Sequence, residues 1–418
     1  MLGLSLIIAF SVGLAIVLIV IGLTMVHSAR LFNRMDAFTK FAPALPIVSA
    51  AAVVILGLGL TLGAVTKVSS VAKAPSTAAG ANPASEASAG FVVSRAQIVF
   101  LGLDKSGQRQ VMLKEMDNGS VRALTQAAQG VSYMAVSPNG TKILYVPYRA
   151  DLGSDLWLYE VIKDESKELV NCVGFICSQA AWSPDGSRVV YEKLALDAGP
   201  DSLGLTSLWW ADVDTGETKS IFQDTQLPGY NPHWSPDGEW LSYSVPGGGI
   251  HVQNLATGKN TIVPSNVTGS AYWSTDSKGF LFDDGYAQAD RFITRIYYFD
   301  LISGDIKNLS LDNVLEDSLA AWSPDGKKIA VVRREIGATL GDQIWIMDAD
   351  GSNASALTDS SGAIHDGLNW SPDGKYLLAH AYLLDKPLSE PVMFMIDIQS
   401  RESTELGEGL RPTWLVKK

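Results

Sequence analysis

The stretch AAWSPDG, residues 180–186, is repeated along the chain. Close copies are HWSPDG at 233–238, AWSPDG at 321–326 and NWSPDG at 369–374, and weaker ones are AVSPNG at 135–140 and YWSTDS at 272–277. Ser-Pro-Asp-Gly is typical of a type I turn, because Pro presets φ at the second position and Gly suits the last. We therefore expect each copy to join two short strands.

The turn lies within a longer unit of four short apolar segments separated by turn residues, as in GYNPHWSPDGEWLSYSV followed by GIHVQNLATGKNTIVP. Tryptophans of successive units are 39 to 52 residues apart. Four strands repeated at about 40–50 residues are the signature of a β-propeller. The large apolar side chain before each turn is suited to fill the space between blades. This predicts a structural role for the repeat tryptophans Trp182, Trp234, Trp273, Trp322, Trp370 and Trp414.

The number of blades follows from the two ends of the repeat region. Six first strands precede a turn serine, and LRPTWLV at 410–416 has the form of a seventh without its turn. At the other end, SRAQIVFLGLD at 94–104 has the form of a second strand that lacks a first. We expect the C-terminal strand to complete the N-terminal blade, which removes an open sheet edge. This predicts an all-β, seven-bladed propeller, with six blades as the alternative.

The motif W-S-P-D-G-x-x-[IL], followed by a strand ending in D-x-x-[GT]-G and then L-T, resembles the TolB-like, WD-type propeller repeat. The resemblance covers residues 91–418. It is specific, because several copies of the motif occur in register. It implies a propeller fold, and it keeps six blades as the alternative because TolB itself has six.

Two apolar, uncharged runs, Leu2 to Val26 and Phe41 to Val65, are each long enough to span a bilayer core of about 30 Å. We expect residues 1–67 to form a two-helix membrane anchor. The loop between the runs carries the basic residues Arg30, Arg34 and Lys40, which favours a cytoplasmic loop. The expected location is therefore the cell membrane, with the propeller extracytoplasmic.

The anchor sequences AFSVGLAIVLIVIGLTMVHSARLF and LPIVSAAAVVILGLGLTLGAV resemble the last two membrane helices of the NicO family of nickel/cobalt transporters. The family handles metal through His- and Asp-bearing motifs in earlier helices, and no such motif occurs within residues 1–67. The resemblance implies ancestry of the anchor or contact with a transporter. A generic two-helix anchor is the alternative. Residues 68–90, rich in Ala, Ser, Gly and Pro, are expected to be a flexible linker to the propeller at 91–418.

The charge and cysteine content limit the kinds of partner and cofactor that the chain is expected to bind. The net charge of −12 argues against nucleic acid, and the acidic balance of the propeller region favours cationic partners or a divalent cation. The two cysteines, Cys172 and Cys177, are expected either to form a disulfide or to be two buried thiols. No G-x-S-x-G, P-loop or zinc spacing occurs, so no cofactor is expected.

Candidate binding residues lie on the face where the long, variable loops emerge, at 194–207, 285–294, 335–341 and 383–391. The loops that run into the first strands could bring six polar residues to the mouth of the central channel, with Asp290 and Arg291 joining from a neighbouring loop. The six are Tyr230, Asn231, His233, Asp317, His365 and Asp366. They could bind a metal or a polar ligand, or they could only satisfy turn backbone and solvent.

The sequence favours a membrane-anchored propeller that binds or scaffolds a protein, peptide or envelope ligand without catalysis. One alternative is an accessory component of a nickel/cobalt transport system. Another is a propeller hydrolase or lyase with channel-facing residues.

Overall fold

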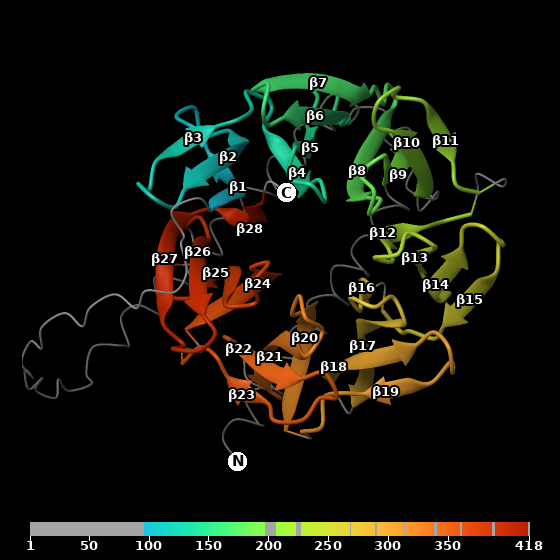
Figure 1. Ribbon diagram of the computed structural model, residues 1–418, viewed down its shortest axis with the longest axis vertical. Helices are drawn as coiled ribbons and strands as arrows, with labels where there is room; N and C mark the ends of the chain where they lie inside the picture. The colour runs from blue at the N-terminus through green and yellow to red at the C-terminus, as the bar shows by residue number, and fades with distance from the viewer. Residues whose placement is uncertain are drawn as a thin grey trace, which may run out of the picture. The chain divides into compact units, whose positions relative to one another are not determined.

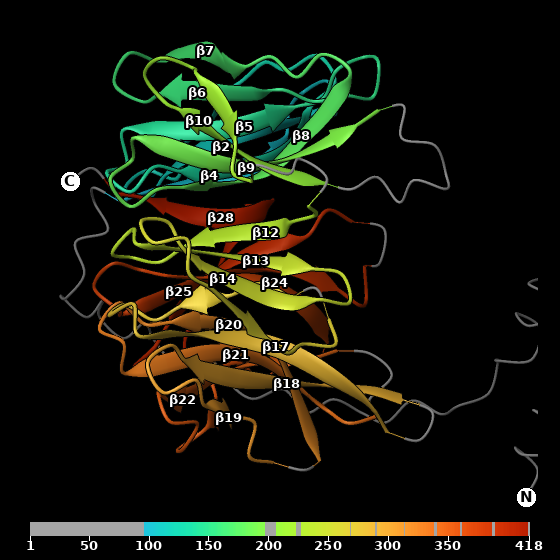
Figure 2. The same cartoon turned by 90° about the vertical axis from the view of Figure 1, so that its right-hand side faces the viewer.

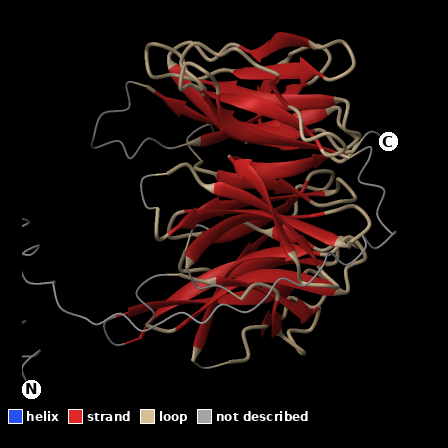
Figure 3. Cartoon of the chain, turned by 90° about the vertical axis from the view of Figure 1, so that its left-hand side faces the viewer, coloured by secondary structure: helices blue, strands red, loops and turns tan. Residues whose placement is uncertain are grey.

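The computed structural model describes residues 96–416, except 197–205, 223–226, 268, 289–290, 313, 338–340, 360–361 and 387–388. Its strands form seven antiparallel four-stranded sheets, which are arranged as blades around a central channel (Figure 1). This confirms the all-β, seven-bladed prediction, and the six-bladed alternative is wrong. Figures 2 and 3 show the ring edge-on, with loops along both faces.

Each blade has its first strand beside the channel and its fourth at the rim (Figure 1). Blade 1 consists of β28 (Leu410–Leu415), β1 (Gln97–Leu103), β2 (Arg109–Glu115) and β3 (Val121–Ala123). Blade 2 consists of β4 (Val131–Val136), β5 (Lys142–Pro147), β6 (Leu156–Glu160) and β7 (Glu165–Val170). Blade 3 consists of β8 (Phe175–Trp182), β9 (Arg188–Ala195), β10 (Ser207–Asp212) and β11 (Thr218–Ser220).

The remaining four blades follow in chain order. Blade 4 consists of β12 (Tyr230–Trp234), β13 (Trp240–Val245), β14 (Gly249–Asn254) and β15 (Asn260–Val263). Blade 5 consists of β16 (Tyr272–Trp273), β17 (Gly279–Gln288), β18 (Arg291–Asp300) and β19 (Ile306–Asn308). Blade 6 consists of β20 (Leu315–Trp322), β21 (Lys328–Glu335), β22 (Gln343–Asp348) and β23 (Ser355–Ala356). Blade 7 consists of β24 (Ala363–Trp370), β25 (Tyr376–Leu383), β26 (Val392–Asp397) and β27 (Ser403–Glu408).

The repeated motif forms the turn between the first and second strands. In blade 3, the Gly186 N–H donates to the Ser183 carbonyl and the Arg188 N–H donates to Ser183 Oγ, both at 2.9 Å. Gly186 has a φ of 71°, which favours glycine, and Ser277 takes a φ of 59° at the same place in the weaker YWSTDS copy. The motif therefore stabilises its turn through contacts within six residues.

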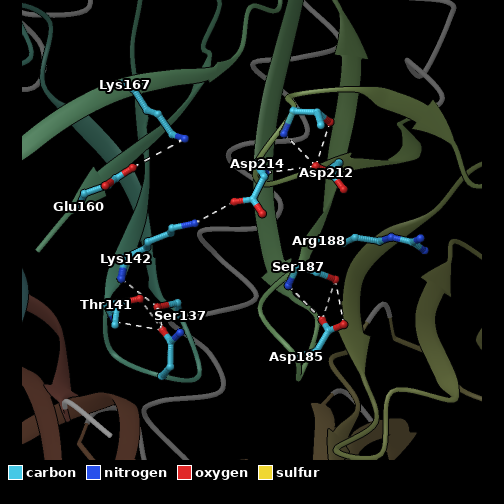
Figure 4. Close-up of polar contacts among 12 residues, drawn as sticks. Ser137, Thr141, Lys142, Glu160, Lys167, Asp185, Ser187, Arg188, Asp212 and Asp214 are labelled. Atoms are coloured by element: carbon cyan, nitrogen blue, oxygen red, sulfur yellow. Dashed lines mark hydrogen bonds and ion pairs between the residues drawn. The ribbon is translucent and has the colours of Figure 1, made fainter.

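The turns also link neighbouring blades. Figure 4 shows Asp185 accepting from the backbone and side chain of Ser187 within the first turn of blade 3. It also shows Lys142 of blade 2 reaching Asp214 in the second tight turn of blade 3, with Nζ and Oδ1 3.4 Å apart. Because Asp214 is exposed, this ion pair contributes little to stability.

The hydrophobic core is divided among the blade interfaces. Seven buried clusters occur in the described residues, and each joins side chains of two neighbouring blades. Several repeat tryptophans cross these interfaces. Nε1 of Trp182, Trp322 and Trp370 donates to a first-strand carbonyl of the preceding blade at 3.0–3.1 Å. Both apolar packing and hydrogen bonds therefore hold one blade to the next.

The C-terminal strand closes the ring. β28 pairs with β1 through Gln97↔Leu415, Ile98↔Trp414 and Val99↔Thr413. Blade 1 is therefore built from both ends of the propeller region, as the strand pattern predicts, and the first strand that the N-terminal segment lacks comes from the C-terminus.

Most first strands carry a bulge that the sequence pattern did not reveal. The pairing with the second strand shifts register in blades 1, 2, 3, 4, 6 and 7. Residues with positive φ lie in five of these strands, namely Gln179, Asn231, Leu319, Gly367 and Arg411. Such bulges bend the strand and leave backbone groups that a neighbouring blade must satisfy.

The anchor and linker predicted for residues 1–67 and 68–90 lie outside the described residues. Within residues 96–416 as described, no helix is long and apolar enough to cross a membrane. Cys172, in the connection between β7 and β8, forms a disulfide with Cys177 of β8, with an S–S distance of 1.97 Å.

Candidate functional site

One face of the propeller carries most of its exposed apolar side chains. Loops between second and third strands, and those between blades, emerge on this face, which we call the long-loop face. Eleven of the eighteen exposed large apolar side chains in the described residues lie at this end of the strands. They are Leu103, Tyr148, Leu152, Val173, Leu227, Tyr286, Phe292, Leu311, Val314, Ile364 and Tyr382. The opposite face, with its tight turns, is poorer in such side chains.

The segment 285–294, predicted as a long loop, is mostly strand. β17 and β18 continue to Gln288 and Arg291 and pair throughout, for example Tyr286↔Ile293. The resulting hairpin extends past the neighbouring blades on the long-loop face (Figure 2). The polar sequence GYAQAD concealed this continuation of the two strands.

The six predicted channel residues do not lie in loops. All belong to first strands: Tyr230, Asn231 and His233 to β12, Asp317 to β20, and His365 and Asp366 to β24. The loop assignment was wrong because the first strands begin earlier than the apolar pattern indicates. Several of their polar side chains have partners on adjacent strands or in the connections beside them.

Asp317 is part of a buried ion pair. Its two carboxylate oxygens accept from Arg333 Nε at 2.5 Å and Nη2 at 2.8 Å, and both side chains are at most 5% exposed. The Arg333 guanidinium also lies over the Trp345 ring, 4.8 Å from its centroid. Asp317 is therefore neutralised inside blade 6 rather than presented to a ligand.

His365 is similarly occupied. Its Nδ1 lies 2.6 Å from Asp342 Oδ1, and the same oxygen accepts the His365 backbone N–H at 2.9 Å. Both side chains are largely buried, at 7% and 10% exposed. The pair ties β24 to the segment before β22.

Asp366 is brought near His380 and Arg411, at the junction of blades 7 and 1. His380 Nε2 lies 3.9 Å from Asp366 Oδ2, and Arg411 lies over the Tyr133 ring at 5.2 Å. Burial lowers the pKa of His380 to about 4, and the Asp366 carboxylate opposes this shift. His380 Nδ1 is buried and has no hydrogen-bond partner among the described residues.

Residues of β12 lie further round the channel. The Asn231 backbone N–H, exposed by a bulge with a φ of 50°, donates to Glu192 Oε1 of blade 3 at 2.8 Å. Burial lowers the pKa of His233 to about 4, and its ring centroid lies 6.4 Å from that of Tyr272. Tyr230 pairs with Ser244 in register. His233 is therefore neutral near pH 7.

Asp290 and Arg291 were predicted to join the site from the neighbouring loop, and the structure describes only Arg291. Asp290 lies outside the described residues. Arg291 begins β18 and lines a cavity of about 320 Å³ together with Glu316 and Arg334. This cavity lies beside the tip of the β17–β18 hairpin, against β20 and the end of β21.

The sequence analysis did not select several polar side chains that share one position in the repeat. Nine residues after each turn serine, on the second strand, blades 3, 4, 5 and 7 carry Glu192, Ser244, Asp283 and His380. Burial raises the pKa of both Glu192 and Asp283. Glu192 bonds the bulge of the next blade, and Ser244 Oγ donates to the Gly269 carbonyl. Counting from the turn serine would have found this set.

The titratable residues around the channel are thus mainly paired within the scaffold. Among the described residues, no three His, Cys, Asp or Glu side chains gather as metal ligands. The arrangement holds bulged first strands in place.

The chain is similar in part to several known proteins. Dipeptidyl-peptidase 5 of Porphyromonas endodontalis is 25% identical, over 47% of this chain and 35% of that protein. The match thus spans about a third of that relative. The solved structure of TolB from Acinetobacter baumannii has a TM-score of 0.47 at 19% identity, covering 73% of this chain and 79% of that one.

A structure from a study of two prolyl endopeptidases has a TM-score of 0.52 at 11% identity, covering 76% of this chain and 50% of that one. At this identity the likeness shows the fold alone. The TolB beta propeller domain matches residues 202–410, which is half of the 418 residues. With several repeat turns in register and seven closed blades, this chain belongs to the TolB beta propeller domain family.

Proposed function

We propose that this chain is a membrane-anchored, extracytoplasmic propeller whose long-loop face binds a protein, peptide or envelope ligand without catalysing its conversion. The observation that carries this proposal is the gathering of exposed apolar side chains on that face. Apolar side chains concentrated on one face of a rigid scaffold mark an interaction surface. The apolar runs at 2–26 and 41–65 support the anchor.

Two further observations support binding over catalysis. Asp317 and His365, two of the predicted channel residues, are held by Arg333 and Asp342. A catalytic acid or base must reach a substrate proton at hydrogen-bond distance. The peptidase relative acts on peptides according to its name, and this supports a ligand that contains peptide.

Site-specific photo-crosslinking of the full chain in its native membrane tests the proposal. A photoreactive amino acid is placed at Leu152, Val173 or Phe292 on the long-loop face, and at Ile162 or Ile302 on the tight-turn face as controls. All five side chains are at least half exposed. We expect discrete adducts from the long-loop positions alone. Equal adducts from both faces, or none from either, would contradict the proposed surface.

Orientation and catalysis need separate measurements. Protease added to intact spheroplasts should digest the propeller, and protection until lysis would place it in the cytoplasm instead. Incubation of the full chain with an envelope extract should leave peptides and saccharides unchanged. Turnover that is lost in His365→Ala would favour the hydrolase or lyase alternative.

A further inference from the structure

A cavity of about 510 Å³ lies between blades 1 and 2, away from the channel. Its lining comes from the connection between β3 and β4, the end of β5, the loop after β5, and strands β6 and β7. The connection and the loop both emerge on the long-loop face, so the cavity opens there. Its volume lies in the range of small-ligand pockets, about 300–1,000 Å³.

Three aromatic rings line this cavity. Tyr145 and Trp157 pair across β5 and β6, with ring centroids 6.2 Å apart and planes tilted by 39°. Tyr148, in the next loop, is 51% exposed. Aromatic rings attract cations through their negative faces, and a cavity with several rings strengthens this attraction.

The charged residues at and beside the cavity wall favour a cation as well. Arg149 is held by two carboxylates, with Nε 3.0 Å from Asp151 Oδ1 and Nη1 2.5 Å from Asp155 Oδ1. Arg149 and Asp155 line the cavity, and Asp151, which is 54% exposed, pairs with Arg149 outside the lining. These three residues together carry one negative charge in excess. Asp155 Oδ2 has no hydrogen-bond partner among the described residues, and Asp155 lines the cavity.

The walls of the cavity are held in place by buried contacts. The side chain of Gln110, 1% exposed, bonds both the N–H and the carbonyl of Ala127 at 2.9 Å and so fixes the β3–β4 connection. On the other side, the Cys172 N–H donates to Asp155 Oδ1 at 2.8 Å, and Arg149 Nη2 donates to the Phe175 carbonyl at 3.3 Å. The disulfide-closed loop thus supports the charged wall.

The chain itself places cations on aromatic rings on this face. Lys193 Nζ, at the end of β9, lies 4.3 Å from the Phe175 ring centroid and 4.2 Å from that of Trp209. Lys193 belongs to the same end of the blades as the cavity. An ammonium held between two rings shows that such sites form readily here.

We propose that this cavity receives the basic side chain, lysine or arginine, of a peptide or protein partner. The proposal rests on the proposed binding function, because it assigns one contact of the long-loop face. Its basis is that the Oδ2 of Asp155, free among the described residues, and three aromatic rings in the lining complement a cation.

Nα-acetyl-arginine amide is the probe, titrated against the full chain in nanodiscs and followed by saturation-transfer NMR. The neutral analogue Nα-acetyl-citrulline amide is the matched ligand control. We expect the arginine probe to bind about tenfold more tightly than citrulline, since cation–π and carboxylate contacts depend on the charge. Equal affinities, or binding of neither compound, would overturn the proposal.

Two variants locate the binding. Tyr148→Ala removes an exposed ring of the cavity, and Tyr286→Ala removes an exposed ring of blade 5 on the same face. We expect Tyr148→Ala to weaken arginine binding about fivefold and Tyr286→Ala to leave it unchanged. Equal losses would place the probe elsewhere. Binding of maltose that requires Tyr148, without arginine binding, would assign a saccharide pocket and overturn the proposal.

The binding and crosslinking experiments distinguish a wrong assignment of this cavity from a wrong proposed function. If arginine does not bind while the long-loop positions still crosslink a partner, only the assignment of this cavity is wrong. If those positions capture nothing, the binding surface itself is wrong, whatever the probe does.

Discussion

Asp317 illustrates how an acidic residue that suggests a ligand site can instead be a structural charge. It lies on β20 and faces Arg333 on β21, and both are withdrawn from water. A buried pair of this kind contributes little compared with an apolar pair, but the loss of one partner leaves an unpaired charge.

Asp317→Asn should therefore lower the free energy of unfolding by about 3–5 kcal/mol. The same substitution at Asp214, which is 86% exposed and pairs with Lys142, should change it by less than about 0.5 kcal/mol. Denaturant unfolding of both variants makes the comparison. The double variant Asp317→Leu/Arg333→Met should recover most of the loss, and no recovery would show that the pair has another role.

The buried His380 should make the stability of the folded chain depend on pH. Its pKa is about 4 in the folded chain and about 6.5 when unfolded, so the unfolded state binds its proton first as pH falls. Stability from this group is present above pH 6.5 and is lost as pH falls towards 4, by up to about 3 kcal/mol. Thermal unfolding between pH 7 and 4 should fall less steeply for His380→Gln than for the parent. Parallel profiles would contradict the burial of a neutral imidazole.

At the scale of elements, the repeat tryptophans differ in what their ring nitrogens do. Trp370 Nε1 donates to the Ala321 carbonyl in the preceding blade at 3.0 Å. Trp234 Nε1 is buried and has no partner among the described residues. The two occupy the same place in the repeat, so they form a natural pair for comparison.

Trp370→Phe should destabilise the chain by about 0.5–1.5 kcal/mol more than Trp234→Phe, because only the first change removes a hydrogen bond to the preceding blade. Both changes remove similar apolar area. The difference between the two losses in unfolding free energy therefore measures the contribution of the hydrogen bond. Chemical unfolding followed by circular dichroism measures it. Equal losses of unfolding free energy would mean that packing alone explains why a Trp recurs at this position of the repeat.

At the scale of the whole molecule, closure of the ring depends on a strand of six residues. β28 supplies the first strand of blade 1 and contacts blade 7 through a cluster that contains Trp414, Ile98 and Leu378. Without β28, β1 has an unpaired edge and two interfaces lose their shared side chains.

Deletion of residues 410–418 should abolish the single cooperative unfolding transition and expose β1, whereas deletion of 417–418 should leave the transition unchanged. A synthetic peptide of residues 410–416 should restore protection of β1 amides in hydrogen exchange. An unaltered transition after the larger deletion would show that six interfaces suffice.

The sequence by itself determined the turns, the four-strand unit and the seventh blade. These depend on contacts within about six residues, such as Ser183 with Arg188, and on strand segments at 94–104 and 410–416 whose missing partners can be counted. Only the tertiary structure decided where the polar residues go. Asp317, His365 and Asp366 meet partners 14 to 23 residues away across bulged strands. A bulge shifts the register by one residue, and nothing in the local pattern marks where it occurs.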